Sequence, residues 1–253
     1  MRAPEDGGGR VGIVMNGSPL FTGAAESGPS NIRKWLLEND LVEAIVALPT
    51  NMFFNTGIAT YIWILDNTKH PDRKDLVQLI DGTSFWTKMR KSLGSKNREI
   101  SNADRDQIVK LYADFTDADP HYSKVLRTDE FGYWTVTVER PLVDEDEKPI
   151  VDRKGKPKPD AKKRDTENVP FTYGGSTAGA TAKTEVIQAY FDAEVKPHVP
   201  DAWIEWGKVK TGYEIPFTRH FYKYVPPRPL AQIDADLEKQ VAKILDLLRE
   251  VEQ

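Results

Sequence analysis

Two short apolar runs, Leu41–Leu48 and Thr60–Asp66, dominate the hydrophobic pattern of the first half of the chain. Each run has the length of a strand and is rich in β-branched or aromatic residues. The residues between them include Pro49, Asn55 and Gly57, which are typical of loops. The pattern therefore predicts two buried strands joined by a loop.

The loop is unusual because two aromatic residues, Phe53 and Phe54, stand side by side among uncharged polar residues. Such a loop favours binding of a planar ligand. The plainer interpretation is that both rings plug the open end of a sheet. The sequence pattern alone favours this plug.

The hydrophobic pattern predicts further strands and helices before and after this pair of strands. Val11–Met15 reads as a short strand, and Leu76–Ile80 as another. Between them, Ser30-Asn31 is the expected start of a helix that ends near Asn39. Its expected inward stripe is Ile32, Trp35, Leu36 and Leu37. A later helix, expected to be capped by Asp104, carries Ile108, Leu111, Tyr112 and Phe115 at helical spacing. The charged segment Lys88–Arg98 is expected at the surface.

The pattern of apolar and polar residues changes in the second half of the chain. Apolar and polar residues alternate from Trp134 to Glu139, as in a half-exposed strand, after an expected aromatic turn at Asp129–Tyr133. Asp144–Lys163 has almost no large apolar residue, so burial cannot offset its ordering entropy, and we expect a mobile linker or extended arm. Thr184–Val195 reads as a helix that prolines terminate.

The last 24 residues carry apolar side chains every three or four positions, which predicts a long amphipathic helix from Leu230 to Glu252. A terminal helix with this near-heptad spacing is as likely to dock on the helices of a partner as to pack on its own domain. The expected docking residues are Leu237, Val241, Ile244, Leu248 and Val251.

The composition limits the kinds of site and partner that the chain can have. A net charge of −4 lacks the basic excess that is usual for a protein that holds DNA by itself. There is no cysteine, and the 4 histidines are scattered, so no metal site is expected. No apolar run is long enough for a membrane span, and the first residues lack the apolar core of a signal peptide. We therefore expect a cytoplasmic protein with no membrane partner.

One motif misleads. Asn168-Val169-Pro170-Phe171 resembles the Asn-Pro-Pro-aromatic motif with which amino-methyltransferases hold a target amine. However, Val169 stands where the first proline should be, and a charged linker precedes it in place of a strand. We interpret it as a decoy.

Four segments, in order along nearly the whole chain, resemble the modification subunit of type I restriction-modification systems, a DNA adenine-N6 methyltransferase. They are Asn16–Phe21, Leu48–Ile58, Asp129–Tyr133 with Val138–Leu142, and Phe217–Tyr222 followed by Pro226–Leu230. Leu48–Ile58 is similar to the aromatic motif that follows the catalytic motif in that family.

The resemblance implies an α/β fold: the C-terminal part of a Rossmann-like class I methyltransferase sheet, followed by a mainly helical C-terminal region with a long terminal helix. Residues 1–126 are then the C-terminal half of the methyltransferase domain. Residues 127–182 are a strand and turn segment with the charged linker, and residues 183–253 are a helical region for subunit docking.

In that family, S-adenosylmethionine sits on a Gly-rich turn after the first strand, and the Asn-Pro-Pro-aromatic motif follows the fourth. Neither is found in this chain. We therefore expect the chain to correspond to the carboxy-terminal portion of such a subunit, with the catalytic motif upstream of Met1. S-adenosylmethionine is then the cofactor of the parent protein and is not expected to bind this chain, which should be inactive alone.

The resemblance also implies a pocket for an adenine that is flipped out of the duplex. Phe53 should form its aromatic wall, and the other expected pocket residues are Phe54, Asn55, Thr56 and Asn16. The implied partners are the specificity subunit, a second modification subunit, the restriction subunit and, through the complex, DNA. The alternative is a non-catalytic assembly module that docks the DNA-specificity subunit.

Overall fold

The computed structural model describes residues 2–177, 179–224 and 226–251. Contacts within the chain divide it into two units, Met1–Phe221 and Tyr222–Gln253. The boundaries expected near residues 126 and 182 both fall inside the first unit, and the three-part division stays a prediction.

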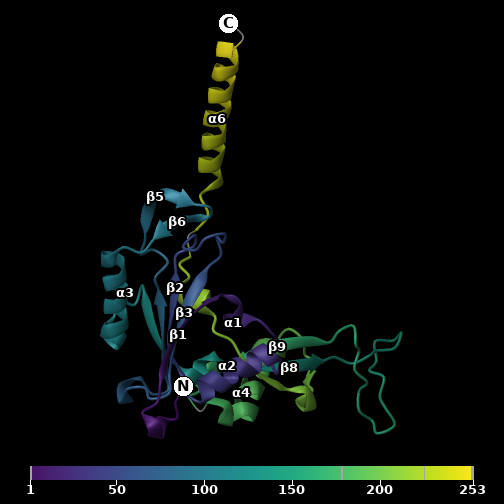
Figure 1. Cartoon of the computed structure of the whole chain (residues 1–253). Coiled ribbons are helices and arrows are strands. Elements are labelled where there is room, and N and C mark those ends of the chain that lie inside the picture. Colours follow the sequence, from purple (N-terminus) through teal and green to yellow (C-terminus); the bar gives the residue numbers. More distant parts are fainter. Residues whose placement is uncertain (1, 178, 225, 252–253) are drawn as a thin grey trace. The chain divides into compact units, whose positions relative to one another are not determined.

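The first unit is built on a five-stranded mixed sheet (Figure 1). Its order is β1 (Arg10–Asn16), β3 (Thr60–Asp66), β2 (Val42–Leu48), β4 (Leu76–Asp81) and β7 (Ser123–Arg127). β3 runs antiparallel to both of its neighbours, and β2 runs parallel to β4. The four strands expected from the apolar runs are thus confirmed, and the fold is mixed α/β.

The core of this sheet has two sides because β2 is buried on both faces, as its continuous apolar run indicates. On one side, Val46 and Ile80 pack with Leu111 of α3 (Asn102–Asp114). On the other side, Ile45 and Leu37 belong to a larger cluster that continues into the second sheet.

The helix α2 (Gly28–Glu38) begins earlier than expected. Its N-cap is Ser27, and proline in the first turn fixes the start, so the predicted cap at Ser30-Asn31 is wrong. Ser30 is instead buried inside the helix, where its Oγ accepts a hydrogen bond from Tyr213 N at 3.1 Å. Of the predicted inward stripe, Leu37 is buried, whereas Ile32 and Trp35 are exposed.

The helix α3 is capped by Ser101, not by Asp104 alone as expected. Ser101 Oγ accepts the amide of Asp104, and the Asp104 carboxylate accepts the amide of Ser101. This reciprocal pair is a capping box.

Arg33 connects α2 to two other segments. Its buried guanidinium donates to the backbone carbonyls of Tyr213, Pro19 and Thr22 at 2.6, 3.1 and 2.8 Å. Burial lowers the pKa of Arg33. These bonds hold α1 (Ser18–Phe21) and β11 (Lys210–Tyr213) against the helix.

The second sheet is centred on β8 (Gly132–Glu139). On one side β8 pairs with β9 (Asp165–Pro170), and on the other with β10 (Trp203–Ile204) and β11. Its predicted inward residues are buried: Trp134, Val136 and Val138. The aromatic turn before it is also confirmed, because Phe131 is buried there.

Asn168–Phe171 lies on this sheet. The residues up to Pro170 belong to β9, so the expectation that no strand is involved was wrong. The interpretation as a decoy agrees with the burial of Phe171, whose ring packs 4.3 Å from that of Trp134 and is closed to a base.

Helical segments complete the first unit. The predicted helix at Thr184–Val195 is α4 (Lys183–Tyr190), continued by a π-helical turn at Phe191–Val195. The remaining short elements are α5 (Phe217–Phe221) and 3₁₀ turns at Pro4–Asp6, Pro71–Arg73, Phe115–Asp117, Thr128–Phe131, Tyr173–Gly175, Gly179–Ala182 and Trp206–Lys208.

The charged segment Asp144–Lys163 forms a looped arm between β8 and β9 (Figure 1). Isolated bridges join Pro141 to Pro159, Val143 to Pro149 and Val151 to Pro157. The arm is thus a series of tight exposed turns, and its mobility stays a prediction.

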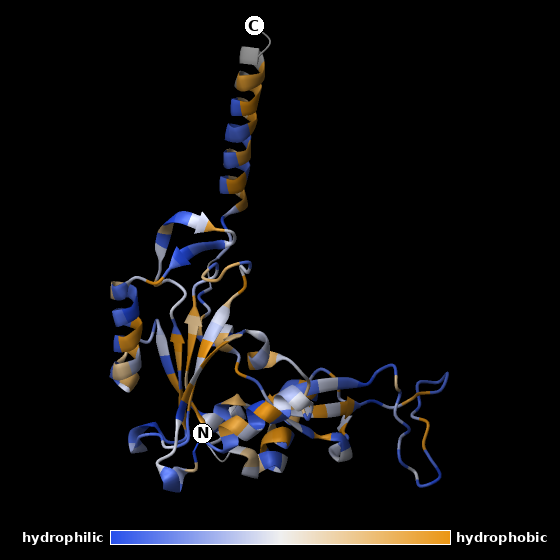
Figure 2. Ribbon diagram, viewed as in Figure 1, coloured by the Kyte–Doolittle hydropathy of each residue, from blue (hydrophilic) through white to orange (hydrophobic). Residues whose placement is uncertain are grey.

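The second unit contains α6 (Leu230–Val251). One side of α6 is apolar and the other hydrophilic (Figure 2). Of the predicted docking residues, Leu237, Val241, Ile244 and Leu248 are all exposed, and the side chain of Val251 lies outside the described residues. In the described part of the chain, no helix has the length and apolarity that crossing a membrane requires.

Candidate functional site

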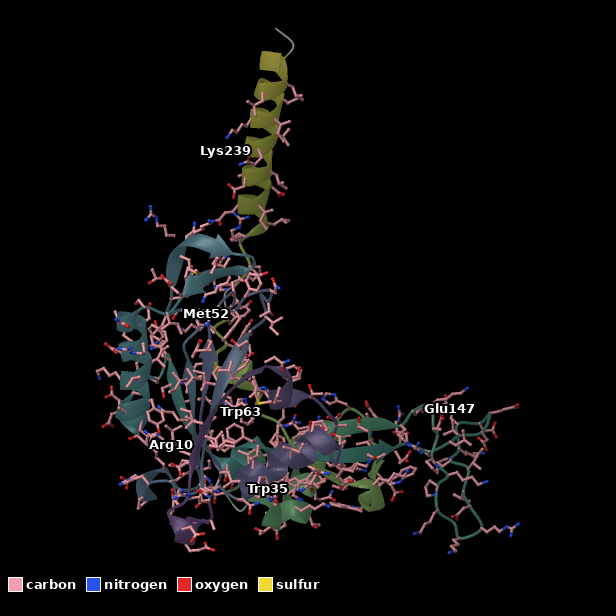
Figure 3. The ribbon with its side chains drawn as sticks, viewed as in Figure 1. Arg10, Trp35, Met52, Trp63, Glu147 and Lys239 are labelled. Atoms are coloured by element: carbon pink, nitrogen blue, oxygen red, sulfur yellow. The ribbon has the colours of Figure 1, made fainter. Side chains whose placement is uncertain are left out.

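The carboxyl ends of three strands meet at one edge of the first sheet. β1 and β2 both run antiparallel to β3, and β4 runs parallel to β2, so β1, β2 and β4 point the same way. Asn16 and Leu48 are both paired with Thr60, which places the end of β1 and the start of the loop at the same level. Ligands of open α/β sheets bind at such an edge. In Figure 3, Met52 marks this edge and Arg10 marks the opposite end of the sheet.

The loop has a defined shape. Asn51 and Asn55 adopt left-handed backbone conformations, with φ of 59° and 58°. Asparagine is one of the few residues that tolerate this region. Phe53 and Thr56 are joined by an isolated antiparallel bridge, so Phe54 and Asn55 form the tip of a tight turn. The structure therefore brings four of the five predicted pocket residues into one turn.

Both phenylalanines of this turn reach the surface. Phe53 is 39% exposed and Phe54 is 65% exposed. Rings that plugged the end of a sheet would be buried against it. The exposures therefore favour ligand binding over the plug.

Asn16, the fifth predicted residue, faces a different feature. Its Oδ1 accepts a hydrogen bond from Ser18 N at 3.1 Å. It also lines an apolar groove of about 460 Å³ between β1, β3 and α2, whose walls include Ile13, Ile32 and Trp63. Phe53 and Phe54 are not among the residues that line this groove. Asn16 thus lies at the same sheet edge as the aromatic turn Phe53–Thr56, but it lines a different surface.

Two polar residues at the same edge were not predicted. Asp81 ends β4, and its carboxylate accepts hydrogen bonds from the amide and hydroxyl of Thr83 at 3.1 and 2.6 Å. Tyr61 lies near the start of β3, where burial, with a smaller contribution from the charge of Asp81, raises its pKa. A polar residue that ends an apolar strand and precedes a glycine, as Asp81 does, was the available signal.

A two-stranded hairpin packs against the loop. It consists of β5 (Thr87–Leu93) and β6 (Lys96–Glu99). The amides of Asn97 and Arg98 donate to the carbonyl of Asn51 at 3.1 and 3.3 Å. The sequence predicted only a charged surface segment here. Its excess of basic over acidic residues was the signal that could have identified it as a functional element.

The residues at this edge supply aromatic and hydrogen-bonding groups that can bind a ligand. Among the residues that the structure describes, no cluster of three His, Cys, Asp or Glu side chains could hold a metal ion. Aromatic faces, amides and nearby cations suit recognition of a nucleobase and its phosphates. The arrangement therefore supports binding.

Comparison with known proteins gives the family. Residues 4–146, more than half of the chain, match the N-6 DNA Methylase family. The chain belongs to this family. The match covers the whole first sheet, the aromatic turn and the hairpin, and it confirms the resemblance found in the sequence.

Several relatives of the chain are named as methylase subunits of type I restriction enzymes. The type I restriction enzyme MjaVIII methylase subunit of Methanocaldococcus jannaschii is 31% identical over 121 residues, 48% of this chain and 20% of that subunit. The MpnII methylase subunit of Mycoplasma pneumoniae is 33% identical over 87 residues, 34% of this chain and 15% of that subunit. The chain therefore spans about a fifth of the length of such relatives.

Among solved structures, the chain is similar to the type I restriction-modification system methyltransferase subunit of Streptococcus thermophilus. The sequence identity is 27% and the TM-score 0.42, with 49% of this chain and 24% of that chain covered.

Proposed function

We propose that the chain takes part in the transfer of a methyl group from S-adenosylmethionine to adenine N6 in DNA, within the methyltransferase subunit of a type I restriction-modification enzyme. The observation that carries the proposal is the exposed aromatic turn at the carboxyl edge of the sheet. An adenine must leave the duplex before its amine can react, and an extruded base is held by stacking on such rings.

In this proposal Phe53 forms the aromatic wall of the base pocket, and Phe54, Asn55, Thr56 and Asn16 complete its rim. The left-handed conformations of Asn51 and Asn55 support this role, because they fix the turn before a base arrives. The strand order β1-β3-β2, with the middle strand antiparallel, is consistent with the C-terminal part of a class I methyltransferase sheet.

The residues present do not fit a complete cofactor site. The glycine run Gly7–Gly9 precedes β1 and leads into no helix, so it lacks the geometry of a cofactor turn. Phe171 of the Asn-Pro-Pro-aromatic look-alike is buried. We therefore propose that residues 1–253 alone bind S-adenosylmethionine immeasurably weakly and transfer no methyl group, and we derive no step through the cofactor.

The partner side of the proposal rests on α6. Its exposed apolar stripe suits helices of a specificity subunit, and the names of the relatives place them in multi-subunit restriction enzymes. DNA, a second modification subunit and the restriction subunit would then join the same assembly. The competing function is a non-catalytic module that only docks the specificity subunit, and the exposed stripe supports it equally.

Replacing Phe53 separates the two functions. In the complete methyltransferase that contains these residues, Phe53→Ala should lower kcat/KM for DNA methylation by about 5- to 150-fold, equivalent to about 1–3 kcal/mol of lost base stacking. Binding of the specificity subunit should not change. Phe53→Trp should restore most of the rate.

The matched control is Trp35→Ala, which removes an exposed ring on α2, away from Met52 of the aromatic loop (Figure 3). It should leave methylation unchanged. Normal methylation by Phe53→Ala, with unchanged assembly, would favour the docking module.

The docking role of α6 is tested by Ile244→Asp with Leu248→Asp, both at sites that are 56% exposed. New charges on the stripe should abolish binding of the specificity subunit, and the α/β unit should stay folded. Ala235→Asp with Ala242→Asp adds the same charge on the other side of the helix and should leave binding intact. If both pairs bind normally, α6 is not the docking element.

A further inference from the structure

The β5–β6 hairpin concentrates positive charge in an acidic chain. Residues 87–99 contain five basic residues and one acidic residue, whereas the whole chain has a net charge of −4. The basic residues are Lys88, Arg90, Lys91, Lys96 and Arg98. The hydrophilic character of β6 is visible in Figure 2.

Four of these cations lack an acidic partner. Lys88, Arg90 and Lys91 are exposed, Lys96 is half-buried, and none of the four forms an ion pair within the described residues. Lysine and arginine side chains are mostly exposed, and an ion pair at the surface contributes little to stability. These four are therefore available to an outside anion.

Arg98 has a different role, because it fixes the hairpin in place. Its guanidinium stacks over the ring of Trp86 at 4.0 Å and donates to Thr50 Oγ1 at 3.0 Å. Together with the two amide bonds to the carbonyl of Asn51, this anchors β6 to the beginning of the aromatic loop.

The hairpin turn also touches the aromatic turn. A side chain added at Gly94 would lie 3.2 Å from the ring of Phe54 and 3.5 Å from Asn55 Oδ1. The unpaired cations are thus carried on an element that contacts the proposed base pocket. A base that stacks on Phe53 or Phe54 stays attached to its own phosphates, so cations on this hairpin are placed to meet the backbone of the same strand.

We propose that the β5–β6 hairpin binds the phosphate backbone of duplex DNA next to the base that is methylated, through Lys88, Arg90, Lys91 and Lys96. The choice of duplex DNA as partner rests on the proposed function. Contacts of this kind position the duplex and carry no sequence information, so they complement recognition by another subunit.

The arm between β8 and β9 provides the contrast that the test needs. Residues 152–163 of the arm hold six basic and two acidic residues, so their net charge of +4 equals that of the hairpin residues 87–99. The arm lies away from the aromatic loop, as the labelled residues Glu147 and Met52 show (Figure 3). Its cations therefore match those of the hairpin in charge but not in position, and they should contribute little to binding if position decides.

The experiment measures binding of a labelled duplex of arbitrary sequence to residues 1–253 by fluorescence anisotropy over a series of low salt concentrations. The hairpin variant carries Lys88→Gln, Arg90→Gln, Lys91→Gln and Lys96→Gln. Its matched control carries Lys154→Gln, Lys156→Gln, Lys158→Gln and Lys162→Gln, exposed arm residues whose replacement changes the net charge equally.

The slope of log K against log salt should fall in magnitude by about 3 to 4 in the hairpin variant, because each lost phosphate contact removes about 0.9. The control should change it by less than about 1. An unchanged slope in the hairpin variant, or an equal loss in both, would overturn the proposal. The pairs Lys88→Gln with Arg90→Gln and Lys91→Gln with Lys96→Gln should each give about half the effect, which keeps the test valid if the fourfold variant misfolds.

Failure here and failure of the proposed function are distinguishable. The slope is measured without cofactor or methylation, whereas the Phe53 test reads methylation and binding of the specificity subunit. If the hairpin variant keeps the wild-type salt slope and Phe53→Ala loses methylation, the phosphate contact is wrong and the proposed function is still supported.

Discussion

The two ends of β2 differ in burial: the amino end is enclosed by polar groups, and the carboxyl end opens to solvent. At its amino end, Glu43 is buried, with its side chain 1% exposed, and is surrounded by donors. At its carboxyl end, the chain leaves the sheet through an exposed turn with two accessible aromatic rings. One strand of seven residues therefore connects a closed polar network to an open surface.

The network around Glu43 joins four segments. Arg10 Nη2 donates to both carboxylate oxygens at 2.9 and 2.7 Å, the Tyr112 hydroxyl donates to Oε1, and Arg73 Nε lies 3.8 Å away. The Arg73 guanidinium also lies between two rings, 4.3 Å from that of Tyr112 and 4.1 Å from that of Phe115.

The difference teaches where stability and binding are located. A buried carboxylate with several donors is costly to disturb, because any partner left behind keeps its desolvation penalty. Exposed rings contribute little to the fold and remain free for a ligand. We therefore expect variants at the two ends to separate folding from DNA recognition.

The largest effect should come from Glu43→Ala. Removing this carboxylate leaves Arg10 and Arg73 without their shared partner, which should lower the free energy of unfolding by about 3–5 kcal/mol. Urea denaturation followed by circular dichroism measures it. Glu99→Ala, at an exposed position of the hairpin, should change stability by less than about 0.5 kcal/mol. A loss below about 1 kcal/mol for Glu43→Ala would mean that the network is not stabilising.

A smaller effect is expected from Tyr112→Phe, which removes one charged hydrogen bond and should cost about 1.5–3 kcal/mol near neutral pH. Burial, then the hydrogen bond to Glu43, raises the pKa of Tyr112 to about 12. Because the folded pKa exceeds the ordinary value of about 10, the phenol's contribution is complete below pH 10 and is lost as the pH rises towards 12.

The measurement is the free energy of unfolding across this alkaline range. Wild type should lose more stability there than Tyr112→Phe does. Tyr222→Phe, at an exposed tyrosine, should keep the wild-type slope. Equal alkaline slopes for wild type and Tyr112→Phe would contradict the assignment.

The smallest effect should come from Gly94→Ala at the open end. Gly94 has a φ of +58°, and an added side chain would press on the ring of Phe54. The left-handed conformation alone should cost about 1–2 kcal/mol, most of it as local opening of the hairpin. Hydrogen exchange of the hairpin amides and DNA affinity at low salt measure this opening.

Gly155→Ala is the matched control for Gly94→Ala, because Gly155 also has a positive φ but nothing within 4 Å of an added side chain. It should open the arm locally and leave DNA affinity unchanged. An identical loss of DNA affinity in both variants would show that contact with Phe54 is unimportant.

Much of the first sheet could be predicted from the sequence because buried strands have a clear hydrophobic pattern. A strand that is buried on both faces, such as β2, is a continuous apolar run, and its loop carries visible turn residues. The start of α2 was missed because Ser27 and Ser30 are both good N-caps, and proline between them decides which one is used. Ile32 was assigned inward because periodicity cannot tell that a groove leaves that side of the helix open.

The hairpin could not be predicted for a different reason. Its strands bury almost nothing, so they show no alternating apolar pattern, and the bonds that hold them come from the distant loop at Asn51. The same holds for the candidate site. The sequence suggested Phe53 and Phe54, but the contact between Phe54 and the turn at Gly94 depends on tertiary structure.

The position of β3 determines the order in which the sheet can assemble. β3 lies between β1 and β2, yet it follows both of them in the chain, so neither β1 nor β2 has this partner until β3 has been synthesised. Leu48 and Thr60 close a short loop, whereas Asn16 and Thr60 close a much longer one, which costs more entropy. The β2–β3 hairpin should therefore form first, and β1 should join a ready-made edge last.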